Sequence, residues 1–271
     1  MHVAKYKQYK QRLLSTVMLF AVLIVSCSNS VTQIEAARST IQQDYGISIQ
    51  TLEAVTQLPR SVVARINNGE TTVQLTQLNN GQYLSYIEIV KKALQKYPSD
   101  LIRKQLKTIY IGGPYQENDA IITGMYGQGV LYLFYNHSGG DNNPLFLEQT
   151  FHHEFSSILI HQYNFDAFGW LKLNPEDFSY IINPEKIDDY MNSIQSYEAD
   201  DALLAQGLVS RYGKTNAEND INTYAELIFT QPEKMKNFIT KYPVIAQKYQ
   251  MLKRFYLSIS PQFKPVFAMI K

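Results

Sequence analysis

The sequence places a histidine and a glutamate side by side, at His153 and Glu154, in a stretch whose pattern predicts a helix. An imidazole nitrogen is a common zinc ligand, and a neighbouring carboxylate can polarise a water molecule bound to the metal. Two imidazoles reach one ion when they lie four residues apart on a helix, because that spacing turns them by only about 40°. His153 and Glu154 are therefore the first candidates for chemistry, as metal ligand and general base.

A second histidine ligand is missing at the expected spacing. The residue four places after His153 is Ser157, and a start one residue earlier, at His152, also meets a serine. His161 is eight residues beyond His153, so it is rotated by about 80° and raised by about 12 Å, too far to share one ion on an unbroken helix. His137, in a Gly-rich loop before the helix, is an alternative that would have to fold back.

The pair resembles the core of the H-E-x-x-H motif of the zincin metallopeptidases, in particular the gluzincin branch and the zinc-binding peptidases found among bacterial lipoproteins. The resemblance covers residues 82–257. It implies a zinc-dependent peptide hydrolase in which His153 binds the metal and Glu154 is the catalytic base.

Gluzincins supply a third ligand from a later helix, often in an E-x-x-A-E-like stretch. The best match is Asn-Thr-Tyr-Ala-Glu at 222–226. This alignment puts Asn222 in the ligand place and Glu226 in the supporting place, whereas a shifted register makes Glu226 or Glu218 the ligand. The resemblance thus implies zinc on His153 and Glu226, with Glu218 as the alternative, in a degenerate site that is impaired or divergent.

A second class of function needs no metal. The scaffold can instead be that of a non-catalytic envelope protein, in which the aromatic strand 129–135 forms a sheet edge that adds an extended peptide or a protein partner. The His-His-Glu triplet can also be an ordinary polar patch on a helix. Tyrosines that could line a binding groove are Tyr126, Tyr132, Tyr135, Tyr163, Tyr180, Tyr190, Tyr197, Tyr212 and Tyr224.

The elements that must position these residues follow from hydrophobic periodicity. Apolar runs predict strands of one sheet at 107–111, 120–123 and 129–135. Helical spacing predicts helices at 84–97, 145–162, 186–208, 217–229 and 232–256. Turn residues suggest a hairpin of 62–66 with 72–76. This order predicts an α+β fold, a small mixed sheet with flanking helices followed by a helical C-terminal half.

The N-terminus predicts export and a lipid anchor. Residues 1–26 contain four cations and no acid, and their apolar run would cover only about 20 Å, which favours a secretory signal over a transmembrane helix. The following Ile24-Val25-Ser26-Cys27 resembles a bacterial lipobox. That resemblance implies cleavage before Cys27, diacylation of its thiol, and attachment to a membrane of the bacterial envelope, which we expect to be the outer membrane.

The predicted domains are a signal peptide (1–26), a lipidated tether and N-terminal segment (27–80) and a zincin-like domain (81–271), the last with a sheet part (81–144) and a helical part (145–271). A hydrophobic content of 45% excludes a disordered chain, and a net charge of +1 gives no electrostatic footprint for nucleic acid. The single cysteine excludes an intramolecular disulfide. The expected partners are a membrane, through Cys27, and a peptide or protein.

Overall fold

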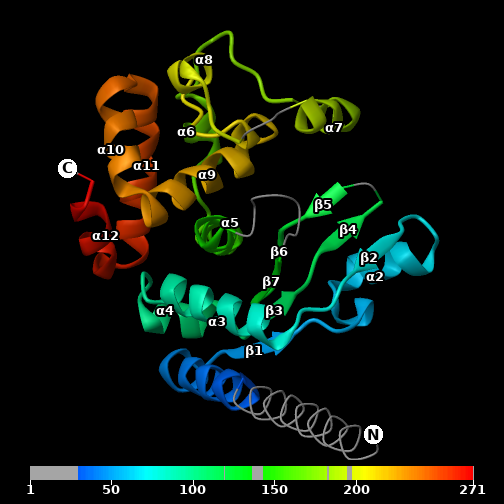
Figure 1. Cartoon of the computed structure of the whole chain (residues 1–271). Coiled ribbons are helices and arrows are strands. Elements are labelled where there is room, and N and C mark those ends of the chain that lie inside the picture. The colour runs from blue at the N-terminus through cyan, green and yellow to red at the C-terminus, as the bar shows by residue number, and fades with distance from the viewer. Residues whose placement is uncertain (1–29, 119, 136–142, 182, 194–196, 271) are drawn as a thin grey trace, which may run out of the picture.

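The computed structural model describes residues 30–118, 120–135, 143–181, 183–193 and 197–270 of the 271-residue chain (Figure 1). It has two small sheets followed by a helical C-terminal half, so the predicted α+β class is confirmed. The predicted signal, Cys27 and His137 lie outside the described residues. Within the described ranges, no helix is both long enough and apolar enough to cross a membrane.

The main sheet has four strands in the order β1-β3-β7-β6. Their bounds are Ser48–Thr51 (β1), Thr108–Gly112 (β3), Val130–Phe134 (β7) and Gly124–Gly127 (β6). The first three run parallel, and β6 pairs antiparallel with β7. The expectation that strand 129–135 forms the edge is therefore wrong, because β7 is an inner strand and β6 is the edge.

A second, antiparallel sheet has the order β2-β4-β5, formed by Val73–Leu75, Tyr115–Glu117 and Ala120–Ile122. Run 120–123 thus forms a strand as predicted, but in a separate sheet. The predicted hairpin is also wrong, since Arg60–Asn67 forms helix α2. Val62 and Ile66, one helical turn apart, both pack against the small core beneath this sheet, which helical periodicity explains and strand periodicity does not.

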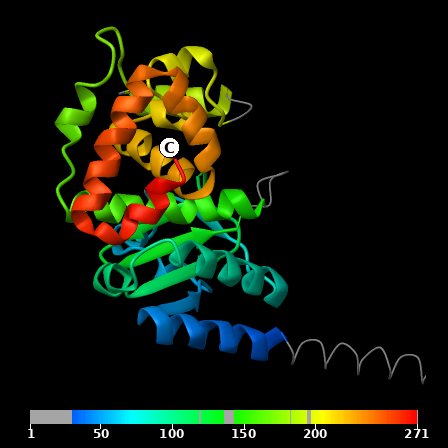
Figure 2. The same ribbon diagram turned by 90° about the vertical axis from the view of Figure 1, so that its left-hand side faces the viewer.

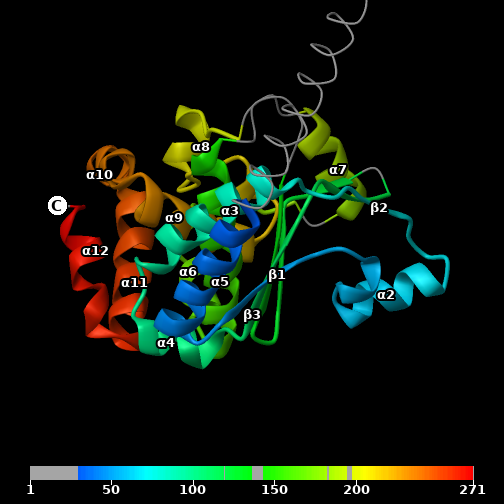
Figure 3. The ribbon, with the colours of Figure 1, turned by 60° about the horizontal axis from the view of Figure 1, so that its bottom comes forward.

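The main sheet separates two apolar cores because successive side chains of a strand point to opposite faces. One face carries Ile109, Ile111, Leu131 and Leu133, which belong to the large core shared with the helices. The other face carries Tyr132 and Phe134, which pack in the small core with Val62. In Figure 3, α2 and β2 project on one side of the sheet, away from the C-terminal helices.

The described helices after α2 are α3 (Asn80–Leu94), α4 (Ser99–Gln105), α5 (Pro144–Gln162), α6 (Ala167–Leu171), α7 (Pro184–Ser193), α8 (Asp201–Ala205), α9 (Ala217–Thr230), α10 (Pro232–Lys241), α11 (Pro243–Ile259) and α12 (Lys264–Ala268). The predictions of α3, α5 and α9 are confirmed. The stretch 232–256 forms two helices instead of one, because Pro243 cannot donate the backbone hydrogen bond that continuation would need. The stretch 186–208 is likewise divided, between α7 and α8.

The stretch expected to be a tether and short segments contributes to the large core. Residues 30–45 form a helix, here called the N-terminal helix, and β1 follows it as the second edge of the main sheet. Ile34, Ile41 and Ile49 of this stretch are buried in the same core as α3 and α5. The N-terminal helix and β1 therefore belong to the same folded unit as the sheet.

Helix α5 crosses the middle of the molecule, between the sheet and the C-terminal helices (Figures 1 and 2). Residues 150–160 are all buried, polar ones included. A helix that is buried on every side shows no amphipathic stripe. Its polar side chains must instead find partners inside the protein. Gln149, His153 and Ser157 find them on α9, whereas Glu148 and His152 contact residues 92–97.

Candidate functional site

Helices α5 and α9 pack against each other in opposite directions and share a series of polar contacts. The pairs are Gln149–Thr230, His153–Glu226, Ser157–Asn222 and His161–Glu218 on the two helices, the third of these being a hydrogen bond between Oγ and Nδ2. Each helix contributes one side chain per turn, because residues four apart lie on one face. We call these four pairs the polar ladder.

His153 is held in the ladder by a carboxylate. Its Nδ1 lies 2.6 Å from Oε1 of Glu226. Burial lowers the pKa of His153, but the carboxylates of Glu226 and Glu154 raise it by more, so that the net direction is upward. Tyr212 covers the imidazole, with ring centroids 5.6 Å apart. The dyad fixes the orientation of the ring and favours its protonated form.

Ser157, at the place where the H-E-x-x-H motif has its second histidine, is occupied by hydrogen bonds. Its Oγ donates to Oε1 of Glu218 at 2.7 Å and accepts from Nδ2 of Asn222 at 2.7 Å. The other carboxylate oxygen of Glu218 lies 3.0 Å from Nε2 of His161, whose ring stacks on Tyr126. Burial raises the pKa of Glu218, and its bonds to Ser157 and the other donors lower it below the ordinary value.

Glu154 lies outside the ladder, on the face of α5 that meets the edge strand β6. A Cβ on Gly124 would come within 2.6 Å of Oε1 of Glu154 and 2.8 Å of Cγ2 of Thr150, so only glycine allows the strand to approach this closely. Burial raises the pKa of Glu154 to about 7; Glu218 and Glu226 add to this effect and His153 opposes it. A carboxyl group with this pKa is poised to exchange a proton near neutral pH.

His152 has a different environment from its neighbour. It is fully buried, forms a 2.8 Å hydrogen bond through Nδ1 with the hydroxyl of Tyr97, and stacks on Phe229. Burial lowers its pKa to about 4. His152 is thus a neutral core histidine, and only the second histidine of the pair reaches the site.

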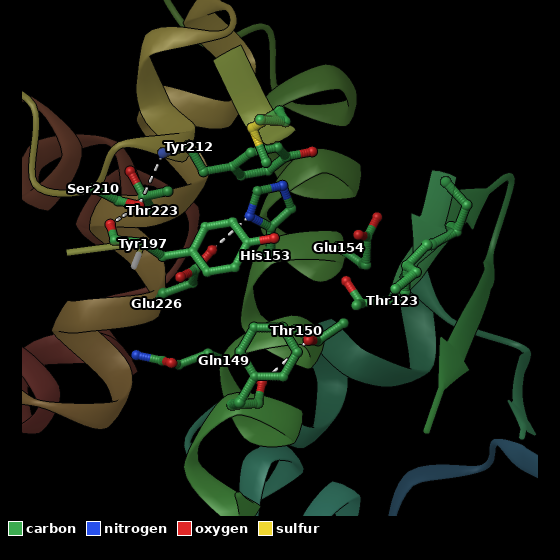
Figure 4. Close-up of a pocket in the computed structure, with 15 residues that line it drawn as sticks. Thr123, Gln149, Thr150, His153, Glu154, Tyr197, Ser210, Tyr212, Thr223 and Glu226 are labelled. Carbon is green, nitrogen blue, oxygen red and sulfur yellow. Dashed lines mark hydrogen bonds and ion pairs between the residues drawn. The ribbon is translucent and has the colours of Figure 1, made fainter. Parts of the chain in front are cut away.

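A cavity of about 220 Å³ opens beside His153 and Glu154 (Figure 4). Its lining comes from β5, β6, α5, α7, α9 and the segment before α9, and consists of Ile121, Ile122, Thr123, Gly124, Phe146, Gln149, Thr150, His153, Glu154, Met191, Tyr197, Ser210, Tyr212, Thr223 and Glu226. Of the tyrosines that could form a groove, Tyr197 and Tyr212 line this cavity. Tyr132 and Tyr224 are core residues instead.

The donor groups at the metal-ligand places do not suit zinc. Zinc in proteins is held by imidazole, thiolate or carboxylate groups. Ser157 presents a hydroxyl that donates to Glu218, and Asn222 directs its amide nitrogen at Ser157. In the part of the chain that the structure describes, no group of three or more His, Cys, Asp or Glu residues is arranged to hold a metal ion.

The structure therefore brings the candidate residues together without testing their roles. Glu226 is the partner of His153, and Glu218 is the partner of Ser157 and His161. Metal binding by His153 and Glu226, and catalysis by Glu154, stay predictions. Sequence analysis did not find Gly124 or Thr150, and the signal for Gly124 was a glycine within a short apolar segment, which often marks a close backbone approach.

Comparison with known proteins supports the fold. No family model matches the chain, and no curated protein has a matching sequence. A crystal structure from Bacteroides caccae, described as a "putative zinc-binding metallo-peptidase", is similar with a TM-score of 0.55 and 16% identity, over 89% of this chain and 91% of that chain. The likeness extends over nearly the whole of both chains, so the overall fold is shared.

Proposed function

We propose that this protein is a peptide-binding protein built on a zincin-like scaffold whose zinc site is incomplete, and that a lipid on Cys27 anchors it to the bacterial envelope. The observation that carries the proposal is the Ser157–Asn222 rung of the polar ladder. Two positions that the motif assigns to metal ligands are joined to each other by a 2.7 Å hydrogen bond, while the cavity beside Glu154 stays open.

The polar ladder supports a site in which the metal ligands are replaced by other ordered side chains, Ser157 and Asn222. The hydroxyl of Ser157 and the amide nitrogen of Asn222 bind each other directly at the two positions where the motif has metal ligands. The hydroxyl of Ser157 in turn donates a hydrogen bond to Glu218. Among the described residues, the Ser157 hydroxyl and the Asn222 amide nitrogen are thus hydrogen-bonded without an ion, and Oδ1 of Asn222 is the buried atom of this rung that has no partner.

The first test is the zinc content of the purified protein by elemental mass spectrometry. We expect less than about a tenth of an equivalent in the wild type, even after incubation with zinc. Replacing both residues, Ser157→His with Asn222→Glu, should restore a three-ligand set with His153 and raise the content to about one equivalent. Each single replacement is the matched control and should bind little zinc.

A competing function is a zinc-dependent peptidase with Glu154 as base, which the pKa of about 7 at Glu154 favours. One zinc per wild-type chain that disappears in His153→Ala, together with peptide cleavage that disappears in Glu154→Gln, would establish that function and contradict ours. Binding of a peptide that remains intact after prolonged incubation would support ours.

A further inference from the structure

The cavity is lined by a buried carboxylate that receives no hydrogen bond from any residue the structure describes. Among the described residues, three acids are buried: Glu148, Asp220 and Glu154. Glu148 receives bonds from two lysines, and Asp220 receives them from Lys248 and two aromatic side chains. Glu154 is only 9% exposed, yet no hydrogen bond to it is formed in this part of the chain. A buried charge without a partner is costly, so its retention at a cavity points to a donor that arrives with a ligand.

Glu154 is directed into the cavity and not into the core. It is among the residues that line the cavity, and Figure 4 shows its carboxylate beside Thr123, on the opposite side of His153 from Glu226. The imidazole of His153, which also lines the cavity, is engaged with Glu226, and the described residues of the lining include no lysine or arginine. The unpaired negative charge of the cavity is therefore concentrated at Glu154.

The opposite wall of the cavity is aromatic. The ring of Tyr197 lies 6.3 Å from that of Tyr212 at 86° and 6.4 Å from that of Phe146, and Tyr212 continues onto His153. Tyr197 is 47% exposed, so this wall reaches the mouth of the cavity. Ring faces attract cations, and flat aromatic surfaces accommodate the aliphatic stems of lysine and arginine.

We infer that the cavity binds a cationic side chain, lysine or arginine, of the peptide partner, with its stem along Tyr197 and Tyr212 and its charged head on Glu154. This inference rests on the proposed peptide-binding function and names its specificity. A cavity of about 220 Å³ accepts one long side chain, not a folded domain. The head group supplies the N–H donors that Glu154 lacks, and a charge-assisted pair in this buried position discriminates strongly against a neutral side chain.

The test uses isothermal titration calorimetry of the full chain in detergent with blocked pentapeptides Ac-Gly-Ala-X-Ala-Gly-NH2. The residue X is lysine, arginine, glutamate or norleucine, the last being a neutral side chain of similar length to lysine. We expect the lysine or arginine peptide to bind at least tenfold more tightly than the norleucine peptide, and the glutamate peptide to be the weakest.

Variants assign the preference to the cavity. Glu154→Gln keeps the shape and removes the charge, so the lysine-to-norleucine ratio should fall below threefold while norleucine binding stays. Tyr212→Leu should weaken all four peptides, because it removes part of the wall. Glu176→Gln is the matched control: Glu176 is exposed and outside the lining, and the ratio should not change.

The outcomes separate the two proposals. Equal binding of the lysine and norleucine peptides, or an unchanged ratio in Glu154→Gln, would overturn the cationic specificity and leave peptide binding intact. No binding of any of the four peptides at millimolar concentration would overturn both proposals. Thermal unfolding of each variant shows whether a loss of binding comes from a loss of structure.

Discussion

Two carboxylates buried in the region of α5 and α9, Asp220 and Glu154, have opposite surroundings. Oδ2 of Asp220 accepts hydrogen bonds from Nζ of Lys248 at 2.7 Å, from the indole of Trp170 at 2.9 Å and from the hydroxyl of Tyr180 at 2.7 Å. Glu154 accepts none from the described residues. Both are buried, but only Asp220 receives hydrogen bonds from described protein donors.

The difference shows how to distinguish a structural acid from a binding acid in one protein. Asp220 joins α9 to α11 through Lys248, which also donates to the carbonyl of Gly207, so its charge is used to hold elements together. The carboxylate of Glu154 forms no hydrogen bond or ion pair with the described residues, and it faces a cavity. Disrupting the ion pair of Asp220 should therefore lower the stability of the protein, whereas removing the charge of Glu154 should weaken the binding of cationic peptides.

Asp220 and its three donors, Lys248, Trp170 and Tyr180, are called the Asp220 cluster here, and breaking it should have the largest effect on stability. Lys248→Met removes the cation and leaves a buried carboxylate unbalanced, so we expect the free energy of unfolding to fall by about 3–5 kcal/mol. Urea denaturation followed by circular dichroism measures this. The matched control is Lys234→Met, which breaks the exposed pair with Glu198 and should cost less than about 1 kcal/mol. Equal losses in the two variants would refute the distinction.

Glu148, buried but close to solvated lysines, should show an intermediate effect that depends on pH. Burial raises its pKa. His152, Lys92 and Lys96 lower it by more, to about 2. The pKa in the folded state is therefore below the value of 4.5 in the unfolded state, so the stabilisation is present above pH 4.5 and is lost on acidification towards pH 2.

The corresponding measurement compares wild type with Glu148→Gln. At pH 6 the variant should be less stable by about 2 kcal/mol, a value that allows for solvent screening of the exposed Lys92. At pH 3 the difference should be less than half as large. A difference that does not change between these pH values would mean that Glu148 acts by packing alone.

Displacing Glu154 should have a smaller effect on stability. Gly124→Ala places a methyl group against Oε1 of Glu154 and Cγ2 of Thr150, and we expect a loss of about 1–2 kcal/mol together with a reduced preference for cationic peptides. Gly127→Ala in the same strand is the control, because no atom lies within 4 Å of its added Cβ. If both variants behave alike, the close approach of β6 to α5 does not matter.

Neutralising Glu154 should have the smallest effect on stability, in the opposite direction. Glu154→Gln relieves the burial of an unpaired charge, so we expect the protein to gain about 1 kcal/mol at pH 8 while it loses cationic specificity. Thermal and urea unfolding at pH 8 measure the gain, with Glu176→Gln expected to change stability by less than about 0.5 kcal/mol. A destabilised Glu154→Gln would show that the carboxylate has a structural role.

The sequence predicted the helices that carry the site better than the segments around them. Helices α5 and α9 are long and bounded by clear signals, Pro144 at the start of one and Asn216 capping the other. Segment 62–66 was misread as a strand, although it lies in helix α2, because a short apolar run fits either period. Strands β1, β4 and β6 were missed, since none of them contains an apolar run of three or more residues.

The candidate site was predictable in part. The spacing of His153 and Ser157, and of Asn222 and Glu226, already places each pair on one helical face. The sequence does not reveal the register between α5 and α9, because the paired residues lie 57 to 81 positions apart in the chain. Tyr197 and Tyr212 lie outside the long helices, so no periodic pattern marked them as one wall of a cavity.

The Asp220 cluster has an optical consequence. Trp170 is the single tryptophan of the chain, and it is fully buried with Nζ of Lys248 5.0 Å from its ring. Its emission, excited selectively at long wavelength, therefore comes from one known environment in the helical half and from nowhere in the sheet. Fluorescence thus samples one site, whereas far-ultraviolet dichroism averages over the whole backbone, and coincident unfolding curves are the result expected if the chain unfolds in one cooperative transition.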